Sequence, residues 1–157
     1  MKKDHLNSTD FNLWHTIREE TEAAAAAEPM LASFLHQTVL RHQSLDSVLA
    51  YHLSSKLGSP IMDVRALFEI YQQALSADTR ISKCVEADLK AIYERDPACD
   101  EYSLPLLYFK GFHAVQAHRI NHWLYQNGRK TLAYFLQNRM SEVFGVDIHP
   151  AARFGHG

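Results

Sequence analysis

The fold is indicated by a stretch at the C-terminal end of the chain, Val146-Asp147-Ile148-His149-Pro150-Ala151-Ala152-Arg153-Phe154-Gly155-His156-Gly157. An apolar residue recurs after six positions, at Ile148 and Phe154, and the small residues Ala152 and Gly155 follow them at corner positions. This spacing is that of a hexapeptide repeat, in which the apolar residue points into a parallel β-helix. Residues 146–157 are therefore predicted to begin a β-helix. The alternative is a polar tail in which two apolar residues fall by chance.

The predicted β-helix is short. A solenoid coil cannot bury its apolar face alone and needs roughly three or more repeats to be stable. The second hexapeptide is not completed before Gly157. We therefore expect the chain to be the N-terminal part of a longer protein.

The sequence before residue 146 has the pattern of helices. Apolar residues recur at three and four positions, most clearly in the stripe Val64, Leu67, Phe68, Tyr71 and Leu75. Seven helices are predicted, over about 11–27, 30–42, 45–57, 64–75, 79–95, 104–127 and 129–144.

The predicted helix ends are marked by capping residues. Helix N-termini are expected at Thr9 or Asp10, at Ser44 and at Asp78, because their side chains can accept hydrogen bonds from the free amides of a first turn. Gly58 is expected to end the third helix in a left-handed conformation.

Length and composition favour a single intracellular domain. A chain of 157 residues can bury an independent core, and Cys84 and Cys99 lack the spacing of a disulfide framework. No N-terminal apolar segment predicts a signal peptide, and no apolar run reaches membrane length. Residues 110–157 hold six Lys and Arg against two Asp and Glu, which is modest for a nucleic-acid surface. We expect a cytoplasmic protein with no nucleic-acid partner and no membrane contact.

Several stretches, spread over about residues 11–157, resemble one enzyme family, serine O-acetyltransferase, in its N-terminal part. They are Glu28-Pro29-Met30-Leu31-Ala32-Ser33-Phe34, Ser59-Pro60-Ile61-Met62, Arg95-Asp96-Pro97-Ala98, Tyr102-Ser103-Leu104-Pro105-Leu106-Leu107-Tyr108, Lys110-Gly111-Phe112-His113-Ala114, Gln116-Ala117-His118-Arg119, His122-Trp123, Phe135-Leu136-Gln137-Asn138 and Val146 to Ala152. The expected organisation is a disordered terminus (1–10), an all-α domain of about seven helices (11–145) and the first coil of a left-handed parallel β-helix (146–157).

The resemblance implies a reaction and its partners. Members of the family transfer acetyl from acetyl-CoA to the hydroxyl of L-serine, giving O-acetylserine in cysteine biosynthesis. L-cysteine can act as a feedback inhibitor at the same pocket. The β-helix assembles trimers, and the helical domain commonly joins two of them, so a homo-oligomer is expected. The residues that bind acetyl-CoA lie on later coils, so we expect this chain to bind no cofactor itself.

The resemblance also implies two site residues and an absent third. A serine hydroxyl needs a base to remove its proton, and a histidine suits that task near neutral pH. By resemblance, Asp147 orients this histidine, which lies beyond Gly157, so the isolated chain is expected to be inactive. His149 and His156 are alternative bases, and we do not favour them, because proximity along a strand does not make two side chains meet.

Asp96, with Pro97 holding its loop, resembles the residue that binds the ammonium group of serine. A carboxylate is the group that an ammonium ion requires. On the residues alone, the alternative is that Asp96 only ends the preceding helix, because the residue before a proline leaves the helical region.

Three further alternatives remain. His118 and His122 are four positions apart and could share a metal, but two imidazoles without a third ligand make a poor site, so helix packing is favoured and no metal is expected. The chain could instead be a non-catalytic module that self-associates through apolar faces such as the region from Tyr102 to Trp123. An acetyltransferase acting on a sugar or another small acceptor is the third, and the helical signatures disfavour it.

Overall fold

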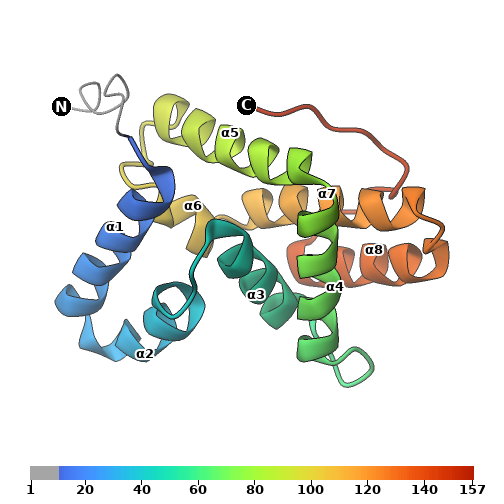
Figure 1. The fold of residues 1–157 in the computed structure, drawn as a ribbon, viewed down its shortest axis with the longest axis horizontal. Helices are drawn as coiled ribbons and strands as arrows, with labels where there is room; N and C mark the ends of the chain where they lie inside the picture. Colours follow the sequence, from blue (N-terminus) through green and yellow to red (C-terminus); the bar gives the residue numbers. More distant parts are fainter. Residues whose placement is uncertain (1–10) are drawn as a thin grey trace.

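The computed structural model describes residues 11–157, and all of its regular elements are helices (Figure 1). In chain order these are α1 (Leu13–Ala27), the 3-10 helix η1 (Pro29–Leu31), α2 (Ala32–Leu35), the π-helix η2 (His36–Leu40), α3 (Leu45–Leu57), α4 (Val64–Ala77), α5 (Thr79–Arg95), α6 (Ser103–Tyr108), α7 (Lys110–Gln126) and α8 (Lys130–Phe144). The predicted all-α architecture is confirmed for this part of the chain. The predicted disordered terminus, residues 1–10, lies outside it.

Several helix N-termini, including those of α1, α3 and α5, are fixed by side-chain caps. Ser44 Oγ accepts the amide of Ser47 at 3.2 Å, and Asp78 Oδ1 accepts the amide of Arg80 at 3.1 Å, as predicted. Helix α1 is capped by Asn12, whose Oδ1 accepts the amide of His15 at 3.1 Å. The predicted alternatives, Thr9 and Asp10, lie outside the described residues.

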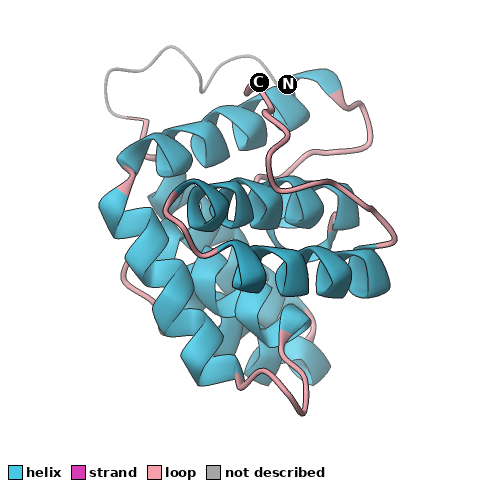
Figure 2. Cartoon of the chain, turned by 90° about the vertical axis from the view of Figure 1, so that its right-hand side faces the viewer, coloured by secondary structure: helices cyan, strands magenta, loops and turns pink. Residues whose placement is uncertain are grey.

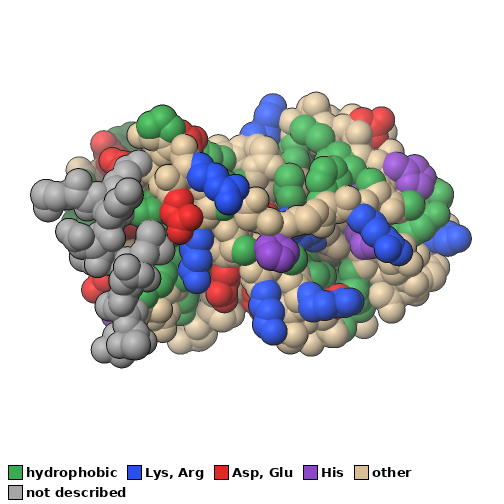
Figure 3. All heavy atoms as spheres, turned by 90° about the horizontal axis from the view of Figure 1, so that it is seen from above, with side chains coloured by type: hydrophobic (Ala, Val, Ile, Leu, Met, Phe, Trp, Pro, Cys, Tyr) green, Lys and Arg blue, Asp and Glu red, His purple; other side chains and the backbone are tan. Residues whose placement is uncertain are grey.

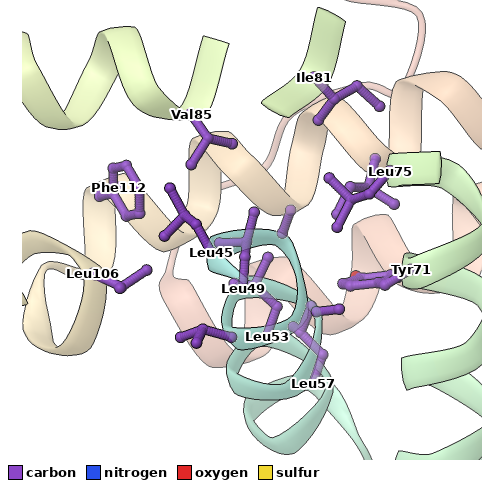
Figure 4. Packing of buried hydrophobic residues seen from close by; sticks show 14 of the residues in the cluster. Leu45, Leu49, Leu53, Leu57, Tyr71, Leu75, Ile81, Val85, Leu106 and Phe112 are labelled. Atoms are coloured by element: carbon purple, nitrogen blue, oxygen red, sulfur yellow. The ribbon is translucent and has the colours of Figure 1, made fainter. Parts of the chain in front are cut away.

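Helix α3 forms the centre of the core. Its leucines at intervals of four, Leu45, Leu49, Leu53 and Leu57, are buried, and side chains from α4, α5, α6 and α7 surround them (Figure 4). Each fully buried leucine contributes about 1.5–3 kcal/mol relative to an exposed one. This burial holds α3 between the helices that carry the candidate site.

The predicted helix over 104–127 is wrong as a single element. The structure breaks it at Phe109, which is extended (φ −86°, ψ 105°), so the described residues contain eight α-helices where about seven were predicted. The break leaves the carbonyls of Leu106 and Leu107 without the amides that would follow in a continuous helix. His113 Nε2 donates to Leu106 O at 2.8 Å, and His52 Nε2 donates to Leu107 O at 3.1 Å. Two buried imidazoles therefore replace the lost backbone hydrogen bonds.

The segment predicted as one helix over 30–42 also differs. It passes from 3-10 to α to π geometry and ends at Leu40. Arg18 Nη1 donates to the carbonyls of Leu40 and His42, each at 3.0 Å, and so satisfies two groups at this end. The predicted left-handed conformation of Gly58 is wrong as well, because its φ is −56°. A Cβ at Gly58 would lie 2.5 Å from Val64 Cγ2, so glycine is needed there for the close approach of α4.

Helices α7 and α8 lie side by side, and residues 146–157, called the C-terminal segment below, run back over α7 (Figures 1 and 2). Gly145, in the left-handed conformation at φ 71°, ends α8 and starts this return. Within residues 11–157 the C-terminal segment forms no strand, so the β-helix coil stays a prediction. None of the described helices combines the length and hydropathy that a membrane crossing requires.

Candidate functional site

The C-terminal segment is attached to α7 by side chains. His122 Nδ1 donates to Pro150 O at 2.7 Å, and His118 Nε2 donates to Ala152 O at 2.9 Å. The His118 ring also meets the Phe154 ring edge-on, with centroids 5.0 Å apart. Burial lowers the pKa of His118, which keeps the imidazole neutral at neutral pH. Helix α7 thus provides two imidazole donors for backbone carbonyls of the segment.

A charged residue of α7 makes the next attachment. Arg119 donates through Nη1 and Nη2 to Gly155 O, at 3.1 and 2.7 Å. Its Nη2 also lies 2.7 Å from Oδ2 of Asp88, on α5. Asp88 Oδ2 accepts Gln116 Nε2 at 2.7 Å, and Asp88 Oδ1 accepts the amide of Gly157 at 2.9 Å. One largely buried ion pair therefore joins α5, α7 and the C-terminal segment.

A cavity of about 700 Å³ opens beside this ion pair, and we call it the Asp96 cavity. Its lining includes Asp96, Phe112, Gln116 and Arg119 together with residues 154–157 of the C-terminal segment. The face that carries α5 and the C-terminal segment shows Lys and Arg side chains spread over it (Figure 3). The structure therefore places Asp96, the predicted serine ligand, in the lining of a cavity whose wall includes the end of the described chain.

The local geometry of Asp96 fits both of its predicted roles. Its amide donates to Ile92 O at 2.9 Å, so it ends α5, and its Oδ1 accepts the amide of Ala98 at 2.9 Å. Pro97 is exposed and forms the turn that follows. The carboxylate is half-buried at the edge of the cavity. Helix termination and ligand binding are thus compatible at this residue.

Asp147 lies elsewhere. Its side chain is exposed and accepts Gln137 Nε2 of α8 at 2.8 Å, and it is not part of the Asp96 cavity. His149 binds the amide of Ala151 through Nδ1 at 3.1 Å, and its ring contacts Tyr125 and Tyr134. His156, the other alternative base, lines the Asp96 cavity. Within this one chain the structure does not bring Asp147 and Asp96 together.

A second cavity, of about 1020 Å³, lies between the start of α5 and the end of α7. His118 and His122 are among its lining residues, with ring centroids 6.2 Å apart. Both rings bind carbonyls of the C-terminal segment, and no third residue among positions 11–157 completes a metal-binding group with them. Helix packing, the role predicted for these two histidines, is therefore only part of what they do, because both also donate hydrogen bonds to backbone carbonyls.

Part of the apolar face suggested for self-association is buried in this chain. Tyr102 and Phe112, within the region from Tyr102 to Trp123, are 3% and 5% exposed and belong to the core.

Two residues beside the Asp96 cavity, Asp88 and Arg119, were not predicted from the sequence as site residues. Arg119 stands in a matched stretch, but nothing in the sequence pairs it with a carboxylate 31 positions earlier.

Comparison with known proteins gives the same family throughout. The family described as "Serine acetyltransferase, N-terminal" matches residues 13–117. The serine acetyltransferase of Escherichia coli strain K12 is 52% identical over 145 residues, which are 92% of this chain and 53% of that relative. The solved serine acetyltransferase of Neisseria gonorrhoeae in complex with serine is 89% identical, with a TM-score of 0.95 over 99% of this chain and 64% of that one.

Further solved serine acetyltransferases, in complex with CoA and with cysteine, are 49% identical. Their TM-scores are 0.89 and 0.90, and the match covers 92% of this chain and 61% and 60% of theirs. The chain spans about half the length of the curated relatives it matches. A family match over residues 13–117, together with these identities, shows that the chain belongs to the serine acetyltransferase family.

Proposed function

We propose that this chain is the N-terminal part of a serine O-acetyltransferase, which transfers acetyl from acetyl-CoA to L-serine. The observation that carries the proposal is the position of Asp96 in a cavity whose wall includes residues 154–157. Relatives that share this part of the chain are named serine acetyltransferases and were solved with serine, CoA or cysteine. A carboxylate at the cavity edge suits the ammonium group of an amino acid.

The proposed reaction assigns one role to each predicted residue. The Asp96 carboxylate binds the ammonium group of L-serine, and Pro97 fixes the turn that holds it. Asp147 orients a histidine on a later coil, which takes the proton of the serine hydroxyl as its oxygen attacks the thioester carbonyl. Collapse of the tetrahedral intermediate breaks the C–S bond, and the thiolate of CoA receives the proton. Because Asp96 and Asp147 are separate within one chain, we place the complete site between neighbouring subunits.

L-cysteine is the proposed competitive inhibitor of the same site. It carries the same ammonium and carboxylate groups as serine, so Asp96 would bind both molecules. A relative solved in complex with cysteine supports this assignment.

The proposed continuation of the chain is a left-handed parallel β-helix. Phe154 stands at the second apolar position of the hexapeptide pattern and is 50% exposed, although an inward-facing residue of a solenoid should be covered. Following coils would cover it. Trimers formed by such coils would account for a site shared between subunits.

The helical domain is the proposed contact between trimers. Met30 is 89% exposed, and Leu31 and Phe34 next to it are 43% and 37% exposed. Grouped exposed apolar side chains mark interaction surfaces, and here we assign a second copy of this chain. Met30→Glu should reduce the molecular mass measured by light scattering. Ile61→Glu, at a separate residue that is 83% exposed, is the control. An unchanged mass for Met30→Glu would contradict the assignment.

The test of the function uses the full-length enzyme and this chain in parallel. We expect serine-dependent release of CoA from acetyl-CoA by the full-length enzyme and none by residues 1–157. Asp96→Asn in the full-length enzyme should reduce kcat/KM for serine about 100-fold, because a charged hydrogen-bond partner of the ammonium is lost. Asp100→Asn, at an exposed position in the same loop, is the control. Robust turnover by residues 1–157 would show that the base is not on a later coil.

A further inference from the structure

The ion pair between Asp88 and Arg119 is largely buried and is hydrogen-bonded to the C-terminal segment. The Asp88 side chain is 14% exposed and the Arg119 side chain 9% exposed. Withdrawing two charges from water carries a penalty of several kcal/mol per ion, so a buried pair needs good geometry and further hydrogen bonds. The further partners here are Gly155 O and the amide of Gly157, both in the C-terminal segment, and Gln116. Backbone groups of the segment are thus two of the three further partners of the pair.

The hydrogen bonds at this ion pair fix both ends of one short stretch. Arg119 binds the carbonyl of Gly155, and Asp88 binds the amide of Gly157, two residues later. The residue between them, His156, and both glycines line the Asp96 cavity. Neither glycine has a side chain that could anchor it in the wall, so the two ions determine where this stretch lies.

We propose that Arg119, held by Asp88, is a positioning residue for the serine site at the Asp96 cavity. It fixes residues 155–157 against α5 and α7, and so sets the distance between Asp96 and the chain that follows Gly157. The proposal rests on the proposed function, because the binding of serine needs Asp96 and the following coil at one separation. Displacement of a catalytic group by about 1 Å can reduce the rate on the order of 100-fold.

Two substitutions in the full-length enzyme separate this role from simple stability. Arg119→Lys keeps one positive charge but loses the fork that reaches Asp88 and Gly155 together. Asp88→Asn is milder, because the amide oxygen can still accept Arg119 and Gln116. Its NH₂ group would then face the N–H of Gly157, so the hydrogen bond to the C-terminal segment is lost selectively.

The chain offers a matched control in Arg139 on α8. Arg139 also donates to two backbone carbonyls, those of Leu57 and Gly58, at 3.2 and 3.1 Å, and also pairs with a carboxylate, Glu142. It does not line the Asp96 cavity. Arg139→Lys therefore removes the same kind of contact away from the site.

We expect Arg119→Lys and Asp88→Asn to raise KM for serine at least 10-fold, with KM for acetyl-CoA changed less than 2-fold. Arg139→Lys should leave both values unchanged. Hydrogen exchange of the amides in residues 155–157 should accelerate in the two site variants only. Unchanged serine kinetics in both variants, or an equal loss for Arg119→Lys and Arg139→Lys that follows their thermal stability, would overturn the proposal. A wild-type enzyme that fails to acetylate serine would instead overturn the proposed function.

Discussion

Acidification should destabilise this protein through two buried histidines, His52 and His113. Their side chains lie at the break between α6 and α7, 4% and 1% exposed, with ring centroids 5.0 Å apart. Burial lowers the pKa of each to about 4 from the ordinary 6.5, and the neighbouring His113 ring adds to the shift of His52. In the folded protein both rings are therefore neutral and donate through Nε2 to Leu107 O and Leu106 O.

The sign and size of the effect follow from proton linkage. Between pH 6.5 and pH 4 the unfolded chain binds more protons at these rings than the folded chain does, so stability falls as the pH falls. With a folded pKa of about 4 and an unfolded value of 6.5, each histidine removes about 2 kcal/mol of unfolding free energy between pH 7.5 and pH 5. The pair removes about 4 kcal/mol, a large part of the about 5–15 kcal/mol that stabilises a typical domain.

The assay is urea unfolding followed by circular dichroism at pH 7.5 and pH 5. His52→Gln and His113→Gln together keep amide donors for the two carbonyls and remove both titrating groups, so this variant should lose about 4 kcal/mol less than the wild type between the two pH values. Leu106→Ala is the control, because it should destabilise by about 2–5 kcal/mol at both pH values without changing the difference between them. Equal losses in the wild type and the double glutamine variant would refute the reasoning.

Two smaller predictions concern helix ends. Gly145→Ala should lower the unfolding free energy by about 1–2 kcal/mol, because position 145 is left-handed at φ 71°. Gly111→Ala is the control and should not lower it, because a Cβ at position 111 would meet no other atom within 4 Å. Thermal unfolding measures both variants. Asn12→Ala should cost about 1 kcal/mol because the amide of His15 loses its cap, and Asn12→Ser should retain most of the stability in the same measurement.

The helices could be predicted from the sequence where local signals are strong. Capping at Ser44 and Asp78 depends on residues within one turn, and the stripe from Leu67 to Leu75 faces the core as its period requires. The break at Phe109 could not be predicted, because the imidazoles that make it tolerable come from His52, 55 positions before the Leu107 carbonyl it binds, and from the following helix. Gly58 was misjudged for a similar reason, since it is Val64 in the next helix that requires a glycine there.

The candidate site was predictable only in part. Asp96 and Asp147 were predicted as site residues from short matched stretches of sequence, and their roles stay predictions. The Asp88–Arg119 pair depends on two helices crossing beneath a third segment, and no short stretch contains that information.

The same limit explains why the region from Tyr102 to Trp123, which includes most of α7, remained an alternative surface for self-association. A surface helix shows one apolar stripe, whereas a helix covered on both sides loses this period. Ile120 and Leu124 of α7 pack into the core, while His118 and His122 on the same helix bind carbonyls of the C-terminal segment. The buried His118 ring donates to a backbone carbonyl, so a polar residue can belong to a covered face of the helix. Helix α7 therefore carries the core and the C-terminal segment together, and substitutions that loosen one should be tested for their effect on the other.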